Sequence, residues 1–130
     1  MSSMNVAAIV LLVNAVSVDG ACSVTPNAEG VVTIPADWTV IPELAFNRCE
    51  DLRKVLIPAK IWAIKGYAFA YSGLEVVDFA AGSKLEIIGP SAFSNTETVT
   101  IDIPISVAEF DAENVFGYTP CDNKSVFRPG

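Results

Sequence analysis

The sequence contains no histidine, and its 8 lysine and arginine residues are outnumbered by 15 aspartate and glutamate residues. Without histidine the chain cannot form a Ser-His-Asp or Cys-His nucleophile pair, a histidine-ligated zinc site or a switch that titrates near pH 6.5. The formal net charge of -7 repels phosphate groups, which argues against a nucleic-acid partner. A glycine-rich phosphate loop and a set of metal ligands are also missing, so we expect neither enzymatic activity nor a cofactor.

Apolar runs long enough to span a bilayer, which takes roughly 20 residues, are absent as well. The amino-terminal run from Val6 to Val18 is shorter and is interrupted by Asn14 and Ser17. Its length and the small residues after it are typical of a secretory signal peptide, which we expect over residues 1–20. The absence of lysine or arginine before Val6 leaves an apolar amino-terminal cap or an uncleaved anchor as alternatives. We expect a secreted or cell-surface protein without a membrane-spanning helix.

What the sequence does contain is an internal repeat within one domain that is 52% hydrophobic and 18% charged. Phenylalanine recurs at positions 46, 69, 93 and 116, and three of the four follow an alanine. In the same three units an isoleucine stands five positions before the phenylalanine, at Ile41, Ile64 and Ile88. A large apolar residue stands eight positions before it, at Trp38, Ile61 and Leu85. The pattern predicts about four units of 23–24 residues.

Each unit also contains a short alternating segment, and proline follows it in three units. The alternation predicts strands that point two apolar side chains inward, and the proline ends each strand because it cannot donate a ladder hydrogen bond. The Φ-x-x-Φ spacing that follows, as in Ile61 and Ile64, predicts a helical or 3₁₀ turn. Stacked units would bury their apolar faces on one another. The predicted core columns are Phe46, Phe69, Phe93 and Phe116; Ile34, Ile57, Phe79 and Ile103; and Val32, Val55, Val77 and Ile101.

The residues between the inward positions would form the exposed face of the sheet, which is our candidate partner-binding surface. They are Thr33, Leu56, Asp78 and Asp102, with Val31, Lys54, Val76 and Thr100 in the neighbouring column. This mixture of apolar and polar side chains suits a protein or glycan ligand. Four strands ~4.8 Å apart give a patch only about 15–20 Å wide, so binding should be weak unless it is multivalent.

Two acidic residues of this face and three aromatic residues elsewhere each allow two interpretations. Asp78 and Asp102 would be neighbours, and like charges that lie opposite each other are either solvated or bridged by a cation such as calcium. Trp62, Tyr67 and Tyr71 either stack on a sugar or a partner, or pack in the core and at its rim.

Three cysteines, Cys22, Cys49 and Cys121, allow at most one internal disulfide. Because no two have C-x-x-C spacing, neither a zinc knuckle nor a redox pair is predicted. We expect Cys49 to be a buried, unreactive thiol. A bond between Cys22 and Cys121 is a weaker alternative, since a stack of repeats holds its two ends apart.

The segment from Ile57-Pro58 to Ala68-Phe69 resembles the BspA-type leucine-rich repeats, in which a strand is followed by Ile-Pro, V-x-x-I, a glycine and Ala-Phe. The segment from Phe79 to Phe93 is similar to a longer variant, and Cys49 and Leu52 stand at the family's cysteine and leucine positions. The resemblance covers about residues 31–120. It departs from the family pattern at Ser72-Gly73 and at Val115-Phe116, so the last unit could be a cap.

This resemblance implies a small right-handed leucine-rich-repeat solenoid with a short parallel β-sheet on one side and short helical turns on the other. The repeat domain would occupy residues 21–120 and a tail or cap residues 121–130. The family implies a secreted or cell-surface module for binding or adhesion through the concave sheet face. The alternative is a structural unit, or a fragment of a longer array, that self-associates through its repeat ends, which would then be apolar.

Overall fold

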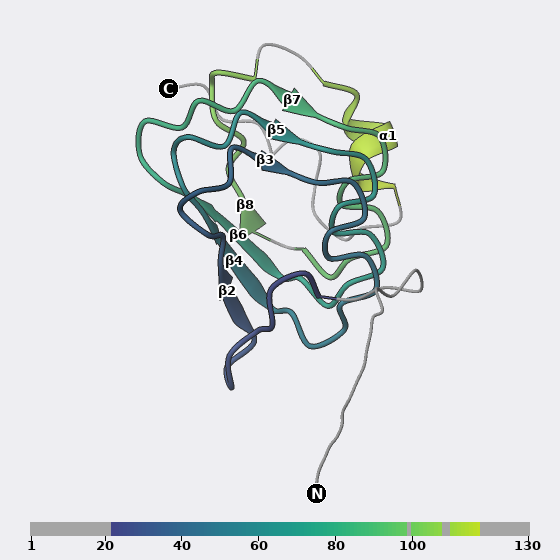
Figure 1. The fold of residues 1–130 in the computed structure, drawn as a ribbon. Coiled ribbons are helices and arrows are strands. Elements are labelled where there is room, and N and C mark those ends of the chain that lie inside the picture. The colour runs from purple at the N-terminus through teal and green to yellow at the C-terminus, as the bar shows by residue number, and fades with distance from the viewer. Residues whose placement is uncertain (1–21, 99, 108–109, 118–130) are drawn as a thin grey trace, which may run out of the picture.

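The computed structural model describes residues 22–98, 100–107 and 110–117, and it consists of successive coils of chain that lie side by side (Figure 1). We use "coil" for the chain from one strand of the first sheet to the next. The predicted signal peptide over residues 1–20 and the tail over residues 121–130 lie outside the described residues. The elements are β2 (Val31–Thr33), β3 (Val40–Ile41), β4 (Lys54–Ile57), β5 (Ala63–Ile64), β6 (Val76–Phe79), β7 (Ile87–Ile88), β8 (Thr100–Ile101) and α1 (Ala112–Phe116).

The first sheet has four parallel strands in the order β2-β4-β6-β8. Its register aligns Val32 with Val55, Val55 with Val77, and Val77 with Ile101, and all four side chains are buried. β-Branched side chains favour strands because they pack well on a pleated surface. The predicted parallel strands are thereby confirmed.

A second parallel sheet, of order β3-β5-β7, replaces the helical turns that we expected. Ile41, Ile64 and Ile88 align in it as buried neighbours. The chain turns at Ala59 and Lys60, before Ile61, and both Ile61 and Ile64 are then buried without a helix. The prediction of 3₁₀ or helical turns in these segments was wrong.

Tight turns form the third side of each coil, near α1 (Figure 1). Six residues other than glycine hold φ between 56° and 63°, at matching positions in three coils. The N–H group of each one donates to a carbonyl oxygen of the following coil at 2.9–3.3 Å. The left-handed conformation costs about 1–3 kcal/mol per residue and therefore persists only where such bonds fix it. The six are Leu44, Arg48, Tyr67, Tyr71, Ser91 and Asn95.

The core is a column of phenylalanine rings. Phe46, Phe69 and Phe93 lie parallel, with ring centroids 5.2 Å apart between neighbours, and Phe116 continues the column 5.4 Å beyond Phe93. Ile34, Ile57 and Ile103 are buried as well, whereas Phe79 is half-buried at the edge of the core. The Phe93 N–H donates to the Val115 carbonyl, so the unit with Val115-Phe116 keeps the same packing although α1 replaces its turn.

The segment before the first strand closes the amino-terminal end of the stack. Cys22 forms a disulfide with Cys49, and the Ser23 N–H donates to the Ala45 carbonyl oxygen at 3.0 Å. Val24 packs against the core beside the same coil. Cys49 is therefore not a free thiol, and the alternative of a Cys22–Cys121 bond is also wrong, because Cys22 is already bonded to Cys49 in the first coil.

Candidate functional site

The face of the first sheet brings the predicted contact residues together. The register aligns Thr33 with Leu56 and Leu56 with Asp78, and the neighbouring column aligns Val31, Lys54, Val76 and Thr100. Thr33 and Asp78 are exposed and Leu56 is half-buried. Asp102, also exposed, follows the last paired residue of β8 and therefore lies beyond the paired part of the sheet.

A shallow hollow of about 200 Å³ opens on this face near the ends of β4 and β6. Three of its lining residues, Thr33, Leu56 and Asp78, were predicted from the alternation. The other three, Ile57, Pro58 and Ala80, were not predicted as contacts. Their signal in the sequence was the proline at the end of the strand, since the chain turns there and opens space beside the sheet.

The carboxylates on this face do not form a metal site within the described residues. No group of three or more histidine, cysteine, aspartate or glutamate side chains there is placed to hold an ion. Calcium takes six to eight oxygen ligands, and Asp78 and Asp102 alone supply too few.

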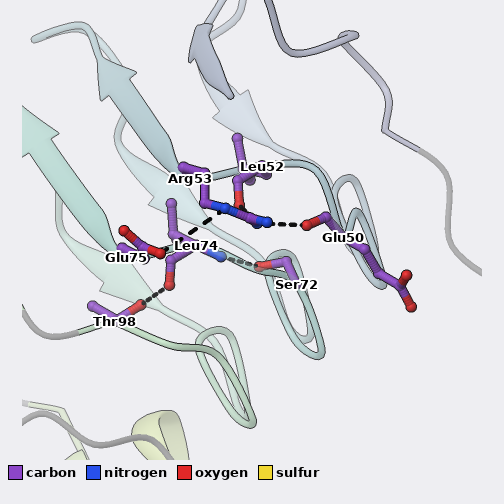
Figure 2. A network of polar contacts seen from close by, with 7 residues as sticks. All are labelled: Glu50, Leu52, Arg53, Ser72, Leu74, Glu75 and Thr98. Atoms are coloured by element: carbon purple, nitrogen blue, oxygen red, sulfur yellow. Dashed lines mark hydrogen bonds and ion pairs between the residues drawn. The ribbon is translucent and has the colours of Figure 1, made fainter. Parts of the chain in front are cut away.

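A second, polar hollow of about 520 Å³ lies where the strands of the first sheet begin. Its arginines already have partners within the chain: Arg53 Nη1 donates to the carbonyl oxygens of Glu50 at 2.6 Å and Leu52 at 3.0 Å, as Figure 2 shows. Arg53 Nε is 3.9 Å from the Glu75 carboxylate. A Cβ at Gly73 would collide with the Arg53 guanidinium group, so glycine makes room for this arrangement. The geometry indicates a structural cap on exposed carbonyls.

Buried hydroxyl groups continue this network into the stack (Figure 2). Ser72 Oγ donates to the Phe69 carbonyl at 2.7 Å and accepts from the Leu74 N–H at 3.3 Å. Thr98 Oγ1 donates to the Leu74 carbonyl at 3.2 Å. The buried Ser72 and Thr98 hydroxyl groups therefore have hydrogen-bond partners. This explains how the second coil can bury a polar serine at the position where the first coil has Cys49.

The aromatic candidates lie away from the first-sheet face. Trp62 precedes β5 of the second sheet, and Tyr67 and Tyr71 belong to the left-handed turns; all three are exposed. The Arg48 guanidinium lies 4.7 Å from the centre of the Tyr71 ring. The structure therefore does not gather these rings into one surface with Leu56 and Asp78.

No helix within the described part of the chain is long and apolar enough to cross a membrane. No curated protein and no solved structure matches the chain. A family model described as a BspA-type leucine-rich repeat region of six copies matches residues 27–123. That range includes both sheets, the left-handed turns and α1. The chain therefore belongs to the BspA-type leucine-rich repeat proteins.

Proposed function

We propose that the protein is a non-enzymatic binding module, a short right-handed solenoid that docks another protein on its first-sheet face. The observation that carries this proposal is the hollow bounded by Thr33, Leu56 and Asp78 on an exposed and partly apolar sheet face. The family and the amino-terminal apolar run support a place outside the cell or on its surface.

The dimensions of the face support a protein partner. The hollow of about 200 Å³ is smaller than the roughly 300–1,000 Å³ of pockets that enclose a small molecule. An interface that combines apolar and polar side chains around one such depression is typical of protein contacts. Because the sheet is narrow, each contact should be weak, and adhesion would depend on several copies that bind together.

The closed amino-terminal end makes the alternative, an end-to-end assembly unit, less favoured. Cys22 is tied to the first coil by the disulfide, and Val24 covers part of the core. End-to-end stacking through this side would need exposed apolar residues here. The segment with Cys22 and Val24 therefore disfavours association of a second copy through this side of the repeats.

The experiment presents the full chain on fluorescent beads, so that weak contacts add up, to arrays of purified extracellular proteins and of oligosaccharides. Leu56→Arg places a long charged side chain in the hollow, and Ile87→Arg, at an exposed position of the second sheet, is the matched control. We expect some protein spots to bind both the wild type and Ile87→Arg. At these spots Leu56→Arg should give a signal at least about tenfold lower, because a loss of about 1.4 kcal/mol of binding free energy lowers affinity tenfold. Binding to oligosaccharides alone, equal binding by both variants or no binding at all would overturn the proposal.

A further inference from the structure

The hollow on the first-sheet face combines an apolar lining with one exposed carboxylate. Leu56, Pro58 and Ala80 contribute carbon-rich surface, and Asp78 contributes the charge. A side chain bound here would therefore need an apolar body and a complementary polar end.

The volume of the hollow limits its occupant to one side chain. A cavity of roughly 150 Å³ accepts a group the size of benzene, and about 200 Å³ is only slightly larger. A disaccharide or a drug-sized molecule needs more enclosed space than this. The size thus favours a single residue that projects from a docked polypeptide.

The charge on the face favours a basic residue. Within the described residues the Asp78 carboxylate forms no ion pair. The ion pair found among these residues joins Arg53 to Glu75. Lys54 lies on the same face, but the register places it beside Val76, and it does not line the hollow. The net charge of -7 also attracts basic partners over a longer range.

We infer that the hollow binds a lysine or arginine side chain of the partner protein, and this inference rests on the proposed function of the first-sheet face. The methylene groups of the basic side chain pack along Leu56, Pro58 and Ala80. Its cationic end stays at the surface beside the Asp78 carboxylate. Long basic side chains commonly bury their stems on apolar surface while the charge remains in water.

The test compares two short peptides, acetyl-Gly-Ser-Lys-Ser-Gly-amide and the same peptide with norleucine in place of lysine, which keeps four side-chain carbons without the charge. Each is titrated into the isotopically labelled full chain, and the amide NMR shifts report both the affinity and the contact residues. We expect both peptides to shift Thr33, Leu56 and Asp78. The lysine peptide should bind about two- to fivefold more tightly, which is the range for an exposed ion pair.

Two matched variants assign the effect to one carboxylate. Asp78→Asn should remove the preference for lysine, whereas Asp51→Asn, at an exposed position before β4, should preserve it. Equal binding of the two peptides to wild type, or a preference that survives Asp78→Asn, would overturn the basic subsite and leave the proposed sheet-face function standing. Shifts at these residues from a neutral hexasaccharide, with none from either peptide, would overturn both.

Discussion

Phe69 lies between two other rings and is completely buried. Parallel rings with centroids 5.2 Å apart are in the range of offset stacking, so each ring contacts both neighbours as well as its own coil. The ring therefore contributes to three coils at once. A cavity at this position would remove contacts that no other residue can restore.

We expect Phe69→Ala to lower the free energy of unfolding by about 3–5 kcal/mol, because it removes a buried ring and leaves a cavity. Tyr67→Ala, two positions away and 43% exposed, is the matched control and should cost much less. Urea unfolding followed by circular dichroism measures both. A loss of less than 1 kcal/mol for Phe69→Ala would show that the ring column is not the core of the folded protein.

At this scale the sequence predicted the columns but not the backbone conformation. The recurrence of phenylalanine at 23–24 residue intervals located Phe46, Phe69 and Phe93, because core spacing must repeat when coils repeat. The left-handed residues gave little such signal, since only Asn95 among the six is of a type that commonly adopts positive φ, and leucine, arginine, tyrosine and serine hold the other positions. Bonds to the following coil fix these conformations, and they exist only after stacking.

Strand β2 is an edge of the first sheet, and Asn27 covers part of that edge. The Asn27 Oδ1 accepts from the N–H groups of Glu29 and Val31 at 2.9 Å, and the Asn27 N–H donates to the Val31 carbonyl at 3.0 Å. Both backbone groups of Val31 are therefore occupied from outside the sheet. Covered edges hinder the pairing of strands from different molecules.

We expect Asn27→Ala to free the Val31 N–H and to promote pairing between β2 strands of two molecules, with a stability loss of about 1 kcal/mol from the lost hydrogen bonds. Light scattering over a concentration series should show an increase in mean mass that wild type lacks. Asn27→Asp retains an oxygen acceptor and should behave as wild type does. A monomeric Asn27→Ala protein at every concentration would show that this cap does not govern association.

Among the elements, the first sheet could be predicted and the second could not. Alternation of inward and outward side chains over Val55 to Ile57 is specific to a strand. The two-residue strands of the second sheet are too short to show alternation, and their isoleucines also fit a helical period. The hollow itself was not predicted. The alternation gave Thr33, Leu56 and Asp78 as residues of the sheet face, whereas Pro58 and Ala80 line the hollow because they follow the ends of β4 and β6.

At the scale of the whole molecule, the disulfide joins the amino-terminal closing segment to the stack. Cys22 and Cys49 are 27 positions apart in the sequence. This pairing could not be predicted, because Cys22 precedes the first recognisable unit and nothing in the repeat pattern places it beside Cys49. The family, by contrast, was predicted correctly from the repeat itself.

Reduction of the Cys22–Cys49 disulfide should lower the free energy of unfolding by about 3–4 kcal/mol, the chain-entropy value for a loop of this length. The measurement is urea unfolding with and without reductant, in a Cys121→Ser background that prevents thiol exchange. A Cys22→Ser, Cys49→Ser double variant should match the reduced protein and should not respond to reductant. Identical unfolding curves for the oxidised and reduced protein would contradict a stabilising role for the bond.

The left-handed turns give the stack a direction. The N–H group of each left-handed residue donates to a carbonyl oxygen of the following coil. The turn conformation of one coil is therefore stabilised by the coil that comes after it in the chain. The ribosome delivers the amino-terminal coils first, at about 5–20 residues per second, and the acceptors for their strained turns lie 22–23 residues further along the chain. In a growing chain, the turns of the last complete coil therefore lack these stabilising hydrogen bonds until the next coil has been synthesised.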